Sequence, residues 1–379
     1  MKESTSYCLQ QYPSLKSSAI NSSKHLGSLS SRALVLFSGS RYHFLSLIKT
    51  NMQQKSFFSL LILFVLSQVS FGQSADADKI NVLVGGTFAK PKIMPALTKL
   101  AIAQLTVNYK LTTTESVIGK EKSTGSMAGA KVTAFLETTD GELVQADFQE
   151  VSDYGYNYFV KQLKANGIET VEWNTIANHE FYKSAEGKQD DKKEKGGNVW
   201  MTGTANNGNE IYGGGTAFSF GKIKKATNFS EDLGAPVAYF NVTVDFADIL
   251  LNVDIKTTRA NGYAFAGYPI RKTKKTKYEG SVTADMNVVP SGMGTMSLLW
   301  NEKTQAETIV IANPIFAGEK YHTEISEDET KVKRKAFAFA KTLQPYIVET
   351  TREQYKAAAK KALERFADAF IAKAKAMKK

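Results

Sequence analysis

Apolar positions recur with two different periods along this chain, and the periods separate predicted helices from predicted strands. Between residues 147 and 163 the spacing is three and four, which is typical of an amphipathic helix with one buried face. This helix is expected to end at Asn166 and Gly167, because glycine is favoured just after a helix. The apolar positions that define it are Phe148, Val151, Tyr154 or Tyr156, Phe159 and Leu163.

A second long helix is predicted at the C-terminal end of the sequence. Thr350 and Glu353 form a capping box ahead of a stripe of apolar residues at helical spacing. The stripe consists of Tyr355, Ala359, Leu363, Phe366 and Phe370. Basic residues dominate positions 373–379, and a helix C-terminus favours positive charge. This helix is expected to pack on a sheet.

Strands are predicted where apolar residues form short runs or alternate with polar ones. Residues 80–84, 99–111 and 168–173 have this character, and a short helix is expected at 175–182. Residues 198–290 are β-rich, and a further strand region is expected at 296–313. Within 237–246 the apolar face consists of Ala238, Phe240, Val242, Val244 and Phe246, and the polar face of Asn241, Thr243 and Asp245.

Two connecting segments lie between the early strands and the first helix. Residues 112–129 are rich in Thr, Ser, Gly and Lys, and this composition predicts a mobile loop. Residues 132–138 and 142–146 flank Gly141, which can supply the positive φ of a tight turn. These two segments are therefore predicted to form a hairpin.

The order of these elements predicts an α+β fold. It would comprise an α/β core sheet with flanking helices, a β-rich insertion and a C-terminal amphipathic helix. The predicted α/β region covers residues 73–197 and the β-rich region covers 198–349. Residues 350–379 form the helix expected to pack on the α/β core.

Residues 52–72 have the pattern of a secretory signal peptide. Lys55 precedes an apolar run from residue 57 to 66, which is shorter than the about 20 residues that a membrane-spanning helix needs. Ser70 and Gly72 are the small residues that a signal peptidase prefers, so cleavage is expected after Gly72. The protein is therefore expected to be exported, to the periplasm or to the outer membrane.

Residues 1–51 are Ser-rich and contain one acid, Glu3. We interpret them as a non-native extension produced by a misassigned start codon; a Ser-rich organelle transit peptide is the alternative. The one cysteine of the sequence, Cys8, lies in this segment. The mature protein would therefore contain neither disulfides nor cysteine nucleophiles.

Charge and motif content narrow the range of functions. Removing residues 1–72 leaves 41 basic and 36 acidic residues, a net charge of +5 that gives no indication of nucleic-acid binding. His179 lacks a second histidine at the spacing of zinc proteases and is interpreted as a helix-surface residue. Ser126 and Gly213 to Gly215 match neither a nucleophile elbow nor a phosphate-binding loop. The sequence therefore predicts a non-enzymatic protein without a catalytic, cofactor or metal site.

A family resemblance follows from the central part of the sequence. A strand at 100–109 is followed by a helix through 158–163, by the sequence GIETVEW at 167–173, and by VWMTGT at 199–204. This order resembles the curli-secretion-channel (CsgG-like) proteins and the N-terminal α/β domain of TolB. The resemblance covers residues 98–255 and 350–379, and it implies an envelope protein that acts in assembly or transport.

Channel members of that family are lipoproteins, whereas this sequence has no cysteine after its leader. They also join β-hairpins into a membrane pore, whose strands alternate apolar and polar residues over about nine to eleven positions. Residues 199–223 and 237–246 alternate only in part. We expect the protein to associate with itself through strand edges or to bind other envelope proteins. We also expect peripheral association with the outer membrane.

The alternative is a periplasmic module or hydrolase for glycans or peptides, in which aromatic residues would line a groove. The basic run at 271–277 could contact an anionic partner, or it could be a solvated loop. The candidate contact residues are Trp200, Tyr212, Tyr263, Phe265, Tyr268, Arg271, Lys272, Lys274 and Lys275.

Overall fold

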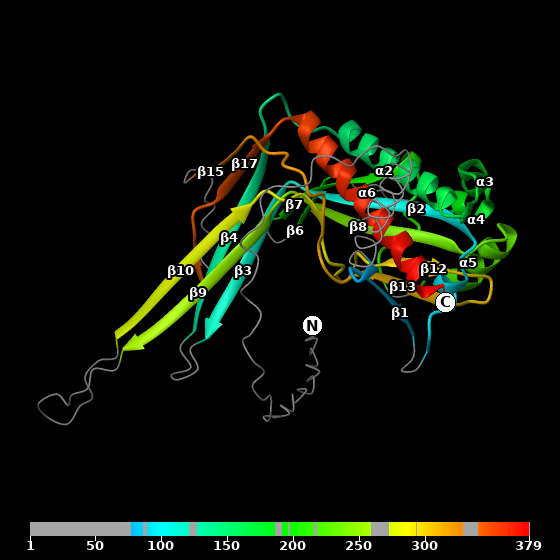
Figure 1. The fold of residues 1–379 in the computed structure, drawn as a ribbon, viewed down its shortest axis with the longest axis horizontal. Coiled ribbons are helices and arrows are strands. Elements are labelled where there is room, and N and C mark those ends of the chain that lie inside the picture. The colour runs from blue at the N-terminus through cyan, green and yellow to red at the C-terminus, as the bar shows by residue number, and fades with distance from the viewer. Residues whose placement is uncertain are drawn as a thin grey trace, which may run out of the picture. The chain divides into compact units, whose positions relative to one another are not determined.

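Two parallel strands, β2 (Lys99–Lys110) and β8 (Val237–Asp245), form the centre of the largest sheet (Figure 1). The computed structural model describes residues 77–85, 89–120, 127–185, 192–195, 198–215, 218–258, 273–292, 294–328 and 340–378. All of them belong to one compact unit. The predicted signal peptide and residues 1–51 lie outside the described residues.

The largest sheet contains ten strands and is mixed. Besides β2 and β8 it comprises β1 (Ile80–Val84), β5 (Glu169–Thr170), β6 (Lys192–Lys195), β7 (Asn198–Thr204), β11 (Asn287–Val288), β12 (Ser297–Trp300), β13 (Ala306–Ile311) and β14 (Ile315–Phe316). The main order is β1-β13-β12-β8-β2-β7-β6. β2 and β8 are bordered by antiparallel partners, β7 and β12, and both are almost fully buried.

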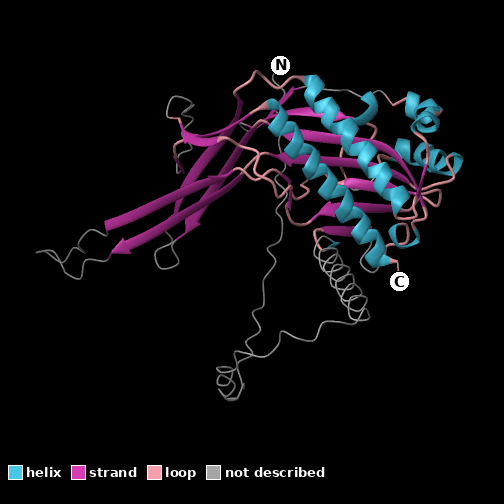
Figure 2. Ribbon diagram, turned by 45° about the horizontal axis from the view of Figure 1, so that its top comes forward, coloured by secondary structure: helices cyan, strands magenta, loops and turns pink. Residues whose placement is uncertain are grey.

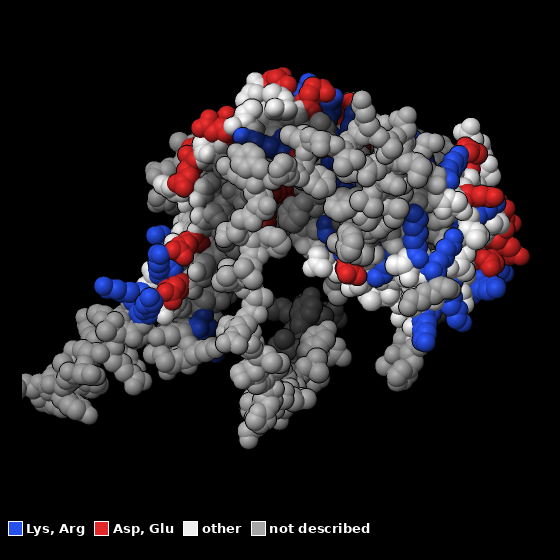
Figure 3. All heavy atoms as spheres, viewed as in Figure 1, with Lys and Arg blue, Asp and Glu red and all other residues white. Residues whose placement is uncertain are grey.

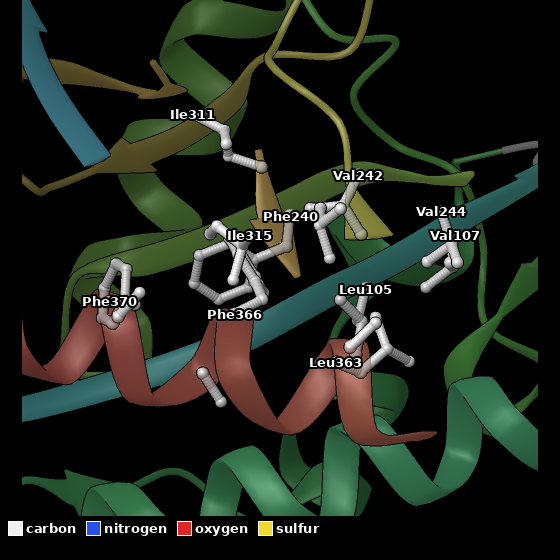
Figure 4. Packing of buried hydrophobic residues seen from close by; sticks show 14 of the residues in the cluster. Leu105, Val107, Phe240, Val242, Val244, Ile311, Ile315, Leu363, Phe366 and Phe370 are labelled. Atoms are coloured by element: carbon white, nitrogen blue, oxygen red, sulfur yellow. The ribbon is translucent and has the colours of Figure 1, made fainter. Parts of the chain in front are cut away.

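Two long helices, α2 (Gln145–Ala165) and α6 (Arg352–Met377), lie side by side over one face of this sheet (Figure 2). Phe366 and Phe370 of α6 have ring centroids 5.7 and 5.2 Å from that of Phe240 in β8. Figure 4 shows these side chains converging from the helix and the sheet. In α2, Tyr156 is the buried member of the predicted pair and Tyr154 is exposed, because Tyr156 faces the sheet and Trp173.

The capping box of α6 lies one residue later than predicted. Thr351 is the N-cap and accepts a hydrogen bond from the N–H of Gln354 at 3.2 Å. Thr350 is fully buried and its hydroxyl donates to the carbonyl of Tyr321 instead. The helix itself and its apolar stripe are confirmed, since Tyr355, Leu363 and Phe370 are all buried.

Three shorter helices cover part of the opposite face. They are α3 (Trp173–Asn178), α4 (Glu180–Lys183) and α5 (Phe220–Asp232). Phe229 of α5 packs with Phe181, and this layer also contains Tyr239 and Trp300 from the sheet. α5 lies within the region predicted to be β-rich, and its apolar positions Ile223, Ala226, Phe229 and Leu233 are spaced for a helix. None of the described helices combines the length and apolar character needed to cross a membrane.

The remaining strands form two smaller sheets. One contains β3 (Thr112–Lys120), β4 (Met127–Thr138), β15 (Glu324–Glu327), β16 (Ala340–Thr342) and β17 (Tyr346–Thr350). In it β4 pairs with β3 on one side and with β16 and β17 on the other. The second is a two-stranded antiparallel sheet of β9 (Asp248–Thr258) and β10 (Thr273–Thr283).

Two predictions for residues 112–146 are wrong. The predicted mobile loop at 112–129 contains β3 and the start of β4, because its Thr and Ser residues pair across a half-exposed hairpin. The predicted hairpin around Gly141 is a strand-to-helix connection, in which Gly141 has φ +114° and α2 starts at Gln145. The α+β class is confirmed by the mixed sheets with flanking helices.

Candidate functional site

Four strands extend beyond the part of the molecule that the helices cover (Figure 1). They form two antiparallel hairpins, β3 with β4 and β9 with β10, which we call the arm. β3 continues β2 after one residue, Leu111, and β9 continues β8 after Phe246 and Ala247. The two central strands of the large sheet therefore lead directly into the two hairpins of the arm.

The β9–β10 hairpin has one covered face and one exposed face. Ile249 and Ile255 of β9 are buried, Leu251 and Val253 are half-buried, and the residues between them are exposed. In β10, Tyr278 and Val282 face the covered side. This alternation is the period of two that a strand with one solvated face requires. The covered face packs on the β3–β4 hairpin.

Glycine allows the hairpins to approach closely. A Cβ atom on Gly119 of β3 would lie 2.8 Å from the carbonyl oxygen of Val253. A Cβ atom on Gly280 of β10 would lie 2.9 Å from a methyl group of Val132 in β4. Neither glycine has a positive φ, so the close approach and not the backbone conformation requires glycine at both positions.

Large apolar side chains are exposed on the outer faces of the arm. Leu250 in β9 is 74% exposed, Ile118 in β3 is 67% exposed and Met127 in β4 is 54% exposed. Charged residues of both signs also lie on the arm, as Figure 3 shows. Lys277 forms an ion pair with Glu279 and lowers the pKa of that carboxyl. The arm therefore presents apolar side chains on a surface of mixed charge.

No third described strand extends the β9–β10 hairpin. β9 and β10 pair with each other along eleven positions, and no other described strand pairs with either of them. Backbone N–H and C=O groups on a strand edge without a partner can bind a further strand. Two of the charged residues on β10, Lys275 and Lys277, are of the kind that limits unspecific pairing at a sheet edge.

The predicted contact residues are not gathered in one groove. Trp200 in β7 is half-buried and lies opposite Lys110. Tyr212 is a core residue, 3% exposed, and packs against Phe218 and Tyr239. The carbonyl of Tyr212 accepts a hydrogen bond from Gln104 in β2. Gln104 and Lys110, the partner of Trp200, are six positions apart along β2, which corresponds to about 20 Å. Tyr212 is thus too deeply buried to line a groove.

The basic candidates lie on or next to β10. Lys275 is exposed and opposite Lys256 of β9, and Lys274 is opposite Thr257. The remaining candidates, Tyr263, Phe265, Tyr268, Arg271 and Lys272, lie outside the described residues. The alternation of Ile249, Leu251, Val253 and Ile255 is the feature of the sequence that indicates strand β9 of the arm.

His179 has a structural role. Its Nδ1 atom accepts the N–H of Phe181 at 3.1 Å, which caps α4. Nε2 therefore carries the ring hydrogen and donates it to Asp232, 3.0 Å away. The ring also packs on Phe229. In the described part of the chain, no group of three or more His, Cys, Asp or Glu side chains is arranged to hold a metal ion.

A cavity of about 710 Å³ lies where the end of α5 meets the β12–β13 turn. Its polar lining includes Lys92, Ser230, Glu231, Asn301, Glu302 and Lys303. Ser230 donates to the carbonyl of Ala235, and Asn301 accepts the N–H groups of Lys303 and Gln305. These two side chains are therefore engaged in local structure, and the charged lining residues are Lys92, Glu231, Glu302 and Lys303.

Comparison with known proteins adds no relative. The sequence matches no protein-family model and no curated protein, and the fold matches no solved structure.

Proposed function

We propose that this chain is an exported, non-enzymatic protein of the cell envelope, located in the periplasm or at the outer membrane, and that its arm binds other protein chains during assembly or transport. The observation that carries this proposal is the β9–β10 hairpin, which pairs with no third strand of the described structure and has an exposed leucine at its base. Copies of the same chain, or other envelope proteins, are the partners proposed.

A strand edge without a partner can bind a further strand. A two-stranded sheet leaves half of its backbone donors and acceptors without a strand partner, and a third strand can pair with them. Exposed apolar side chains beside such an edge add a hydrophobic contribution to strand pairing. Leu250 provides it on the β9–β10 hairpin, and Ile118 and Met127 expose further apolar surface on the β3–β4 hairpin. The predicted signal peptide supports placement of this binding surface outside the cytoplasm.

The test measures the native mass of the protein expressed from Met52. The protein is extracted in mild detergent and examined by light scattering after size separation. A discrete oligomer or hetero-complex is expected. A protein that is monomeric, needs no detergent and co-purifies with no partner would overturn the proposal.

Two variants locate the binding surface. Ile118→Glu combined with Leu250→Glu should dissociate the complex, because both side chains are mostly exposed and their replacement leaves the core intact. Leu83→Glu is the matched control, since Leu83 is 52% exposed on β1, outside the arm. Equal mass of the arm variant and the unaltered protein would contradict a role for these outer faces.

The second candidate function is a periplasmic glycan- or peptide-binding module or hydrolase. The cavity beside α5 supports it, because its lining includes basic and acidic side chains that could hold both ends of a short peptide. Lys303→Glu should then weaken binding of peptide pools measured by ligand-observed nuclear magnetic resonance. Absence of peptide or glycan signals with the unaltered protein would exclude this alternative.

A further inference from the structure

One buried carboxylate, that of Asp245, lies where the arm joins the large sheet. It is 3% exposed. Its Oδ2 atom is 2.6 Å from Nζ of Lys110, and its Oδ1 atom accepts a hydrogen bond from the hydroxyl of Thr113. Oδ1 also accepts the N–H of Ala247 at 3.3 Å. These donors come from the end of β2, the start of β3 and the residue before β9.

The strands change sheets at this place. Leu111 donates its N–H to Val199 in β7 at 2.8 Å, while its carbonyl accepts the N–H of Leu136 in β4 at 3.0 Å. The chain therefore leaves the ten-stranded sheet and enters the five-stranded one within a single residue. On the other strand, Phe246 and Ala247 separate β8 from β9. The hydrogen bonds of Asp245 therefore span the junction between β2 and β3 and the junction between β8 and β9.

The β9–β10 hairpin depends on side-chain contacts for its position. It shares no strand pairing with the rest of the described structure. An isolated two-stranded hairpin is marginally stable in water, so its packing on β3 and β4 is needed to hold it. Away from the root, Tyr346 donates its hydroxyl to the carbonyl of Gly280 at 3.0 Å, and half-buried side chains form the contact.

We infer that Asp245 fixes the start of the β9–β10 hairpin against the start of the β3–β4 hairpin, and we call these two starts, next to the large sheet, the roots of the hairpins. A carboxylate this deeply buried has little access to water that could replace Lys110 and Thr113 as donors. Loss of its charge therefore frees both roots at once and lets the two hairpins separate, while the ten-stranded sheet stays folded. The inference goes beyond the proposed function, because it concerns the arm within a single copy of the chain.

The test measures the distance between the two hairpins. The sequence from Met52 onward contains no cysteine, so Ser116→Cys on β3 and Lys275→Cys on β10 can be labelled selectively with nitroxides. Both positions are exposed. Double electron–electron resonance on the monomer should give one narrow distance distribution. Asp245→Asn should shift this distribution to longer distances and broaden it, and Lys110→Met should do so to a smaller extent.

Lys277→Met is the matched control, because it removes an exposed ion pair from the same hairpin, remote from Asp245. It should leave the distribution unchanged. Far-ultraviolet circular dichroism establishes that each variant is folded, and if Asp245→Asn does not fold, Lys110→Met and Thr113→Val decide the outcome. Folded variants whose distance distributions equal that of the labelled parent would overturn the inference.

Discussion

The carboxylate of Glu307 accepts the backbone N–H of Met94 at 2.9 Å, although 213 positions separate the two residues. It also accepts the N–H groups of Lys92 and Ile93. Glu307 lies on β13 and is 1% exposed. One buried side chain thus satisfies three successive donors at the start of a 3-10 turn, Met94–Ala96, and fixes this turn against the sheet.

Glu307→Gln should destabilise the protein by about 2 kcal/mol, because an amide has one acceptor oxygen and its NH₂ group would face a buried N–H donor. The free energy of unfolding in urea measures this loss. Glu319→Gln, at an exposed loop position, is the matched control and should change the stability very little. Equal effects of the two substitutions would show that the three hydrogen bonds contribute nothing specific.

The long helices could be predicted because their burial follows a regular period, and the strand at 237–246 because its apolar and polar residues alternate, although both of its faces are buried. Phe148, Val151 and Leu163 in α2 are all buried, as the spacing of three and four indicates. The alternating face of residues 237–246 likewise packs under α6. Such patterns persist over ten or more positions, so single exceptions do not hide them.

The arm could not be predicted from composition. Threonine, serine and glycine at 112–129 are typical of loops, yet here Thr114 bonds Thr133 across the hairpin and Gly119 allows close contact with Val253. These roles depend on strands that are distant in sequence. For the same reason aromatic character alone did not distinguish Tyr212, which is a core residue, from a groove residue.

Buried tyrosines should make the protein sensitive to alkali. Burial raises the pKa of Tyr212 to about 12 and has a larger effect on Tyr239. The pKa of Tyr212 in the folded protein lies above its unfolded value of 10.0. The contribution of the neutral, buried Tyr212 to the free energy of unfolding is therefore complete below pH 10 and is lost as the pH rises through 12. Tyrosinate absorbance should therefore rise together with loss of the circular dichroism signal.

Tyr239→Phe tests the origin of this effect. The Tyr239 hydroxyl is buried and has no hydrogen-bond partner in the described structure. Its removal should leave stability at neutral pH unchanged or slightly higher, and should move alkaline unfolding to higher pH. A lower stability of Tyr239→Phe at neutral pH would mean that the Tyr239 hydroxyl has a hydrogen-bond partner, and would contradict this prediction.

Like charges face each other on the sheet of β15, β17 and β4. Glu324 lies directly opposite Glu349, and Glu349 is in register with Glu137. Glu324→Lys should stabilise the fold by about 0.5 kcal/mol, because it replaces a repulsive cross-strand pair by an attractive one. The gain should be measured by chemical denaturation at low ionic strength and should shrink in salt.

Glu302→Lys provides the same change of net charge in the turn between β12 and β13, where no strand pairing places another acid opposite it. It should not reproduce the gain. If both lysine substitutions stabilise equally, the overall charge of the protein and not the pairing of Glu324 with Glu349 would be responsible.

Gly119→Ala tests whether close contact between the hairpins stabilises the arm. The new Cβ atom would lie 2.8 Å from the backbone oxygen of Val253, a distance that requires the strands to move apart. Shortening the Val253 side chain cannot relieve this clash, since the nearest atom belongs to the backbone. A loss of about 1–3 kcal/mol in the free energy of unfolding is expected, as for other overpacked sites.

Gly85→Ala is the control, because a Cβ atom there meets nothing within 4 Å. Alanine is otherwise easier to accommodate in a strand than glycine, so a neutral or stabilising Gly119→Ala would mean that the hairpins are not in contact at this position in solution.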